Sequence, residues 1–125
     1  MQLLLDTQIF IWPVMDSKKL GTEARQIILN AVKVFVSAAS VWEIAIKTKI
    51  GKLEGEPKEF AAAIAKSGFS ELPISAYHAT MVYELPLYHR DPFDRMLIAQ
   101  ALAEPLRILT ADRMLSQYSE LVITV

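Results

Sequence analysis

Hydrophobic positions along the chain follow two spacings, one typical of strands and one typical of helices. Short apolar runs rich in Leu, Ile and Val indicate buried strands, whereas apolar residues three and four apart indicate amphipathic helices. A further extended segment, residues 69–74, contains Pro73 and is therefore expected at the edge of a sheet. The predicted strands are residues 2–5, 32–36, 107–110 and 121–125.

Helical patterns separate these strands, and several have clear start or stop signals. Thr22 and Ser75 can cap helix N-termini, Pro57 suits a first helical turn, and Gly51 suits a helix end. Residues 7–12 are expected to form a short helix or turn that Pro13 interrupts. The other predicted helices are residues 23–31, 40–50, 58–66, 76–84, 92–102 and 111–117.

The regular alternation of strands and helices predicts the fold class. Strands separated by helices are typical of parallel strands joined by right-handed crossovers, with helices on both faces. We therefore expect one domain over residues 1–125, an α/β three-layer sandwich with a central, mostly parallel sheet of four to five strands. No internal repeat or linker interrupts this pattern.

The most strongly specified helix follows Asp91. This residue can accept backbone N–H groups at the N-cap, and Pro92 at the first helical position loses no hydrogen bond. Asp94 then lies in the first turn, where the helix dipole favours negative charge. Because the residues that follow are almost all apolar, the helix is expected to be largely buried although it begins with two acids.

Four acids are predicted to lie at strand-to-helix junctions: Asp6, Glu43, Asp94 and Asp112. In open α/β sheets the ligand crevice lies beyond the carboxyl ends of the strands, so parallel strands would bring these acids together. Each acid also has a structural interpretation. Asp6 and Asp112 can cap turns, Asp94 can pair with the Asp91 cap, and Ser40 with Glu43 fits a capping box. Turn chemistry alone does not explain why carboxylates recur at all four junctions.

A cluster of carboxylates requires protons or cations. Two of them ~4 Å apart repel by ~4 kcal/mol at an effective dielectric constant of ~20. Oxygen ligands without Cys or clustered His favour Mg²⁺ or Mn²⁺, which bind phosphates and activate water. The sequence therefore predicts a magnesium or manganese site that hydrolyses phosphodiesters.

Composition and missing motifs exclude several other functions and locations. The chain has no Cys and only four Gly, and it contains no phosphate-binding glycine motif and no G-x-S-x-G elbow. A net charge of −1 excludes attachment to nucleic acid by bulk charge. Without a signal-peptide pattern, an apolar run long enough for a membrane span, or disulfides, we expect a cytoplasmic protein.

Several side chains near the acids could contact a substrate. Arg90, Arg95 and Arg113 lie within four residues of a candidate ligand, where they could meet phosphates or remain solvated. His89 could contact substrate or cap a helix, whereas His78 is expected to be structural. We expect core positions, rather than base stacking, for the neighbouring aromatic residues. These are Trp12, Trp42 and Phe93.

In several segments the chain resembles PIN-domain ribonucleases, in particular the toxins of VapBC-type toxin–antitoxin pairs. The matching segments occur in the family's order and cover most of the chain. They are residues 3–7, 40–47, 51–53, 72–74, 85–86, 89–101 and 109–112.

The resemblance implies cleavage of RNA that depends on Mg²⁺ or Mn²⁺, with Asp6, Glu43, Asp94 and Asp112 as ligands. It further implies a homodimer and a cognate antitoxin. Asp91 matches an additional acid of this subgroup, although its first expected role is the cap, and Thr7 beside Asp6 is a possible substrate contact. Relatives often have His where this chain has Gln8, which cannot transfer a proton as an acid or base.

Two other functions remain open from the sequence. The chain could be a catalytically silent PIN-like module that binds a partner. A phosphatase or phospho-acceptor domain on a similar sheet is less well supported, because one such class needs an Asp where Gln8 stands.

Overall fold

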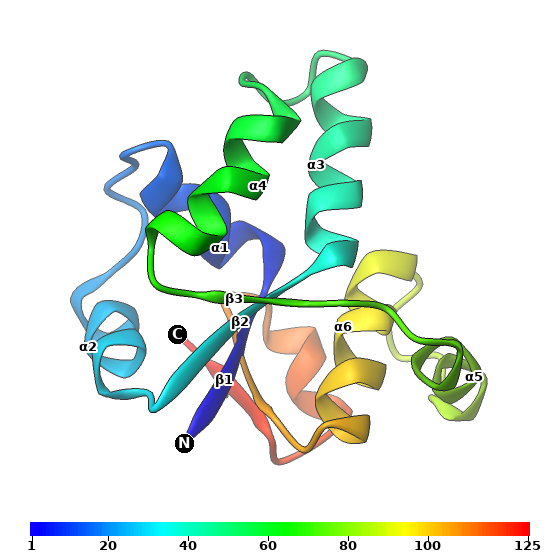
Figure 1. Ribbon diagram of the computed structural model, residues 1–125. Coiled ribbons are helices and arrows are strands. Elements are labelled where there is room, and N and C mark those ends of the chain that lie inside the picture. The colour runs from blue at the N-terminus through cyan, green and yellow to red at the C-terminus, as the bar shows by residue number, and fades with distance from the viewer.

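A computed structural model describes all 125 residues and places the five strands in one parallel sheet (Figure 1). The strand order is β3-β2-β1-β4-β5, and every neighbouring pair is parallel. The predicted fold class is thereby confirmed, and the Pro73-bounded segment forms the edge strand β3. The strands are β1 (Gln2–Leu5), β2 (Lys33–Ser37), β3 (Ser70–Leu72), β4 (Arg107–Thr110) and β5 (Val122–Thr124).

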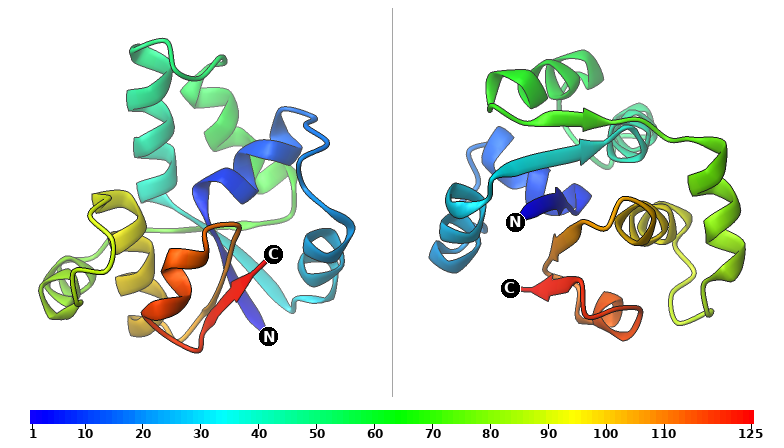
Figure 2. Two further views of the ribbon diagram at one scale, coloured as in Figure 1. Left: turned by 180° about the vertical axis from the view of Figure 1, so that it is seen from behind. Right: turned by 60° about the horizontal axis from the view of Figure 1, so that its bottom comes forward.

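Helices cover both faces of the sheet, as the alternating pattern predicts. In Figures 1 and 2, α1 and α2 lie on one side of the sheet, and α5 and α6 lie on the other. None of the helices has the length and apolar character that crossing a bilayer requires. The helices are α1 (Thr7–Val14), α2 (Thr22–Asn30), α3 (Ala38–Lys49), α4 (Pro57–Lys66), α5 (Ala76–Glu84), α6 (Pro92–Ala103) and the 3₁₀ helix η1 (Arg113–Gln117).

The sheet separates two apolar cores. Alternate side chains of a strand point to opposite faces. Accordingly, Leu3 and Leu5 belong to the core shared with α1, α2 and α4, whereas Leu4 belongs to the core beneath α6. All three leucines are fully buried. Burial on both faces explains why β1 has a continuous apolar sequence rather than an alternating one.

Two predicted helix boundaries are wrong. Pro13 does not interrupt α1 but lies inside it, one residue before the helix ends, where the missing N–H removes only one late hydrogen bond. Helix α3 begins at Ala38, because the hydroxyl of Ser37 accepts the Ala39 N–H at 3.0 Å. The expected Ser40–Glu43 capping box is therefore absent, and Glu43 lies in the second turn of the helix.

The predicted caps of α5 and α6 are confirmed. Asp91 Oδ1 accepts the N–H groups of Phe93 and Asp94, both at 2.9 Å. The Ser75 hydroxyl accepts the His78 N–H at 3.1 Å, and His78 Nδ1 accepts the Ser75 N–H in return. The other ring nitrogen of His78, Nε2, lies 2.6 Å from Glu104, so this buried histidine has the structural role that was expected.

Candidate active site

The four junction acids meet in one cleft at the carboxyl edge of the sheet. The cleft has a volume of about 330 Å³, and Asp91 and Thr7 also line it. The geometry thus brings together every acid that the sequence singled out. The full lining is Asp6, Thr7, Gln8, Trp12, Glu43, Lys47, Asp91, Asp94, Ala111 and Asp112.

Parallel pairing of β1 and β4 brings Asp6 close to Asp112. Asp6 follows β1 as the N-cap residue of α1, and its Oδ2 accepts the Thr110 hydroxyl proton at 2.6 Å. The Thr110 hydroxyl oxygen accepts the Asp112 N–H at 3.0 Å. Through these two hydrogen bonds, the fully buried Thr110 links the ends of two neighbouring strands beneath the cleft.

Glu43 contributes the least satisfied oxygen atom of the cleft. Its side chain is 9% exposed, and Oε2 forms an ion pair of 2.8 Å with Lys47 Nζ, one helical turn away. Oε1 is buried and has no hydrogen-bond partner. A buried, unpaired acceptor carries an uncompensated desolvation cost, which a bound cation would remove.

The negative charge of the cleft alters the protonation of its acids. Burial, followed by repulsion from Asp6 and Asp91, raises the pKa of Asp94 to about 7. Burial also raises the pKa of Asp6, although the Thr110 hydroxyl opposes this shift. The hydrogen bond with Glu43 is the largest of the effects that raise the pKa of Lys47. These shifts indicate a site with too much negative charge for its local compensation.

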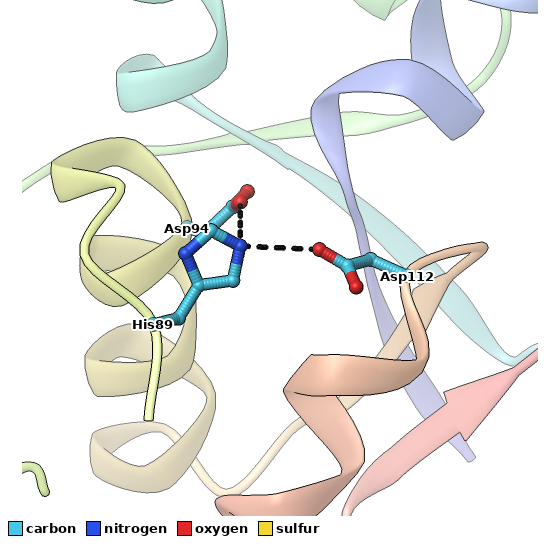
Figure 3. Close-up of side chains that lie close together, drawn as sticks. All are labelled: His89, Asp94 and Asp112. Carbon is cyan, nitrogen blue, oxygen red and sulfur yellow. Dashed lines mark hydrogen bonds and ion pairs between the residues drawn. The ribbon is translucent and has the colours of Figure 1, made fainter. Parts of the chain in front are cut away.

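His89 bridges two of the acids, as Figure 3 shows. This residue lies in the loop before α6, and its Nε2 is 3.2 Å from Asp94 Oδ2 and 3.1 Å from Asp112 Oδ2. Its Nδ1 accepts the Asp91 N–H at 3.1 Å. The expectation that His89 lies beside the acids is therefore confirmed, and the imidazole ties the start of α6 to the loop after β4.

The cleft fits a hard divalent cation. Its acidic groups offer carboxylate oxygens, the ligand type that Mg²⁺ and Mn²⁺ prefer. The unpartnered Glu43 Oε1 and the raised pKa values of Asp6 and Asp94 are the features that a bound cation would relieve. His89, Asp94 and Asp112 offer ligand atoms within 4.8 Å of one another, and the buried acids Asp6 and Glu43 line the same cleft.

Arg95 has a structural role, which is neither the phosphate contact nor the solvated position that the sequence left open. Its guanidinium group donates to the carbonyl oxygens of Val82 and Pro86, at 3.1 and 2.8 Å, and to Tyr118 Oη at 3.2 Å. It is not part of the cleft lining. Arg90 and Arg113 are exposed and form no ion pairs, so either can still meet a phosphate backbone.

Replacing Arg95 by Met should destabilise the fold, since several backbone carbonyls at the end of α5 would lose a charged donor. We expect the free energy of unfolding to fall by ~2–3 kcal/mol. Urea denaturation measures this change, with Arg113→Met as the matched control on an exposed position. Equal stabilities of the two variants would contradict the structural role of Arg95.

Other site residues differ from expectation or were not identified from the sequence. Lys47 is near the acids in the sequence, and its side chain lines the cleft and pairs with Glu43, four residues earlier, instead of being only solvated surface. The hydroxyl groups of Thr7 and Ser40 are buried and 2.9 Å apart, which joins α1 to α3. Trp42 is 59% exposed, so the core position expected for it is wrong, and its ring meets Phe93 edge-on with centroids 5.0 Å apart.

Comparison with known families identifies the class of protein. Residues 3–121 match the model of the PIN domain, so the chain belongs to the PIN domain family. Members of this family are generally nucleases and typically use divalent metal ions. The family's chemistry therefore agrees with the charge and donor set of the cleft. A comparison with curated protein sequences gives no match.

Solved structures with the same fold include three toxin–antitoxin systems. VapBC2 from Rickettsia felis, bound to a promoter DNA fragment, has a TM-score of 0.70 and 15% identity, and the match covers 100% of this chain and 98% of the other. A Klebsiella pneumoniae toxin–antitoxin complex has a TM-score of 0.68 and 21% identity, and the match covers 98% of this chain and 96% of the other. FitAcB from Neisseria gonorrhoeae has a TM-score of 0.62 and 18% identity, and the match covers 90% of this chain and 89% of the other.

Proposed function

We propose that this PIN domain is a divalent-metal-dependent endoribonuclease that hydrolyses RNA phosphodiester bonds. The observation that carries the proposal is Glu43 Oε1, an acceptor that is buried without a partner beside Asp6 and Asp94. Both aspartates have raised pKa values, as expected for carboxylates assembled to bind a cation. Oxygen ligands favour Mg²⁺ or Mn²⁺ as the cofactor.

The chain's own groups have distinct parts in this chemistry. Asp6, Glu43, Asp94 and Asp112 would hold the ion, which when bound polarises a phosphoryl oxygen and lowers the pKa of water. Lys47 fixes Glu43 through their ion pair and adds positive charge at the wall of the cleft. Asp91 fixes the start of α6 as its N-cap, which sets the position of Asp94.

RNA is the proposed substrate class, with the phosphate backbone as its main point of contact. The chain's net charge of −1 gives no general attraction to nucleic acid, so binding must be local. Arg90 and Arg113 are exposed, and each is within four residues of a cleft acid. We assign them backbone contacts, which position a strand without reading its bases.

We further propose that the protein is the toxin of a toxin–antitoxin pair. Its fold matches chains from toxin–antitoxin complexes along nearly their whole length. A cognate antitoxin and a homodimer are therefore the proposed protein partners. Co-expression with the product of the adjacent gene and analysis of the complex by multi-angle light scattering would test both.

Cleavage of RNA by the purified chain tests the proposed activity directly. We expect wild-type protein to cut single-stranded or structured RNA with Mg²⁺ or Mn²⁺ and to stop with EDTA. Asp6→Asn should remove cleavage, because the amide weakens cation binding while Thr110 can still donate to its oxygen. Glu120→Gln, at an exposed acid outside the cleft, is the matched control. Metal-dependent cutting by neither wild type nor control would instead favour a silent partner-binding module.

A further inference from the structure

A second hollow, which we call the apolar pocket, adjoins the acidic cleft. Its volume is about 350 Å³, and it lies between α1, the start of α2 and the residues that follow β4 and β5. Figure 2 shows the C-terminus, which follows β5, beside α2. The Val125 N–H donates to the Thr110 carbonyl at 2.9 Å, which holds this end of the chain against β4. The apolar members of the lining are Ile9, Trp12, Leu20, Ala24, Ala111 and Val125.

Two residues, Trp12 and Ala111, line both the cleft and the apolar pocket. They are the only two hydrophobic residues of the cleft lining, in which five of the other eight residues are acids. In the apolar pocket six of the ten lining residues are hydrophobic, and the single acid, Glu23, is matched by Lys19. The two hollows therefore form one continuous surface with a charged half and an apolar half.

Trp12 is the aromatic residue at the boundary between these halves. Its side chain is half-buried and packs against the core shared with α1 and α2. Its indole N–H donates to no acceptor of the protein and is not buried, since Glu43 Oε1 is the one buried side-chain atom without a partner. A rigid ring that the core holds in place, and that lines both hollows, offers a ligand an aromatic surface and a hydrogen-bond donor.

The division of charge corresponds to the two parts of a nucleotide. A phosphate is charged and binds cations, whereas a base is flat, largely uncharged and stacks on aromatic side chains. We propose that the apolar pocket binds the base of a nucleotide next to the scissile phosphate, and that Trp12 contacts this base. The inference rests on the proposed function and deepens it, because a base can enter the pocket only when it is unpaired. The substrate class is therefore single-stranded RNA, including the loops of folded RNA.

Binding of a short, fluorescently labelled single-stranded RNA of mixed sequence, followed by anisotropy in EDTA, tests the pocket without relying on cleavage. At pH 6 Asp94 is largely protonated, which reduces the repulsion of phosphates. Loss of the stacking surface in Trp12→Leu should weaken binding ~5- to 100-fold, whereas Trp12→Phe keeps a ring and should stay within ~3-fold of wild type. Trp42→Leu is the matched control, because Trp42 is exposed and lines neither hollow.

A second variant tests the pocket without altering the core packing of Trp12. Thr22 is exposed and lines the apolar pocket but not the cleft. Thr22→Phe should fill the pocket and weaken RNA binding as Trp12→Leu does. Thr80→Phe makes the same change at an exposed position on α5 and should leave binding unchanged. A fully paired duplex of the same sequence should bind wild type at least ~5-fold more weakly than the single strand.

The fluorescence of Trp12 reports the contact itself. Trp42→Phe leaves Trp12 as the only tryptophan, since the chain has two. Stacking of a base on the indole should quench its emission, with the same midpoint as the anisotropy titration. Emission that does not change at saturating RNA would contradict the proposal.

Equal RNA affinities of wild type, Trp12→Leu and Thr22→Phe would overturn the base site. If these variants instead lost binding of the cognate antitoxin, the pocket would belong to a protein segment. If wild type cuts RNA with Mg²⁺ while the variants bind RNA normally, only the base site fails and the proposed function stands. If binding depends on Trp12 but no metal supports cleavage, the base site stands and the proposed nuclease activity fails.

Discussion

The variant Asp94→Asn is expected to lose RNA cleavage and, in the same protein, to gain stability in the absence of metal at pH 8. Asp94 combines partial burial with repulsion from Asp6, Asp91 and Glu43, so its ionised form is costly without a cation. Removing a cation ligand forfeits several kcal/mol of transition-state stabilisation, which corresponds to a ~10³-fold or larger loss of rate. Replacing the charged Asp94 carboxylate by a neutral amide should raise the melting temperature of the metal-free protein by roughly 4–8 °C.

Thermal melts in EDTA and RNA cleavage in Mg²⁺ measure the two effects on the same preparations. Glu120→Gln serves as the control, since it also replaces one carboxylate by an amide but lies at an exposed position outside the cleft. The control should retain cleavage and the wild-type melting temperature. A metal-free Asp94→Asn protein that melts below the wild type would contradict the electrostatic description of the cleft.

The second large effect is a loss of stability with rising pH in the metal-free protein. The pKa of Asp94 rises from 3.8 to about 7 on folding, and the pKa of Asp6 is also raised, so the folded state binds more protons than the unfolded state in that interval. The free energy of unfolding therefore falls as the pH rises. The contribution is fully present below about pH 4 and is lost once the pH passes about 7.

The expected size follows from the shift of Asp94. The rise of the Asp94 pKa from 3.8 to about 7 corresponds to ~4 kcal/mol. Solvent screening of a carboxyl group that is only partly buried reduces the expected effect to ~2 kcal/mol. Urea denaturation in EDTA between pH 4.5 and 8 measures this slope, and Asp94→Asn should flatten it. Stability that increases over the same interval would contradict the raised pKa values.

Mg²⁺ should offset this loss, because the cation binds the ionised carboxylates and competes with protons for them. The difference in melting temperature between samples with Mg²⁺ and with EDTA should therefore be small at pH 5 and largest at pH 8. The same comparison with Ca²⁺ indicates how closely the site discriminates between hard cations. If the effect of Mg²⁺ on the melting temperature were independent of pH, the stabilising ion would not be bound by the acids of the cleft.

The sequence by itself determined the order of strands and helices and the edge at which the acids meet. These features depend on local chemistry: apolar spacing defines each element, and Asp91 with Pro92 defines the start of α6 within one turn. Parallel pairing then follows from the alternation of elements, and it brings Asp6 and Asp112 together although they lie at opposite ends of the chain.

Only the tertiary structure decided the orientation of side chains and the division of tasks among them. Arg95 and Asp94 are adjacent in sequence, yet one donates to the carbonyls at the end of α5 while the other faces the cleft. Similarly, Trp42 is exposed beside the buried Glu43. Consecutive residues point ~100° apart on a helix, so the packing of that helix against others settles which of them reaches the site. The partners of His89 and Asp112 depend on contacts between distant segments, which no local pattern encodes.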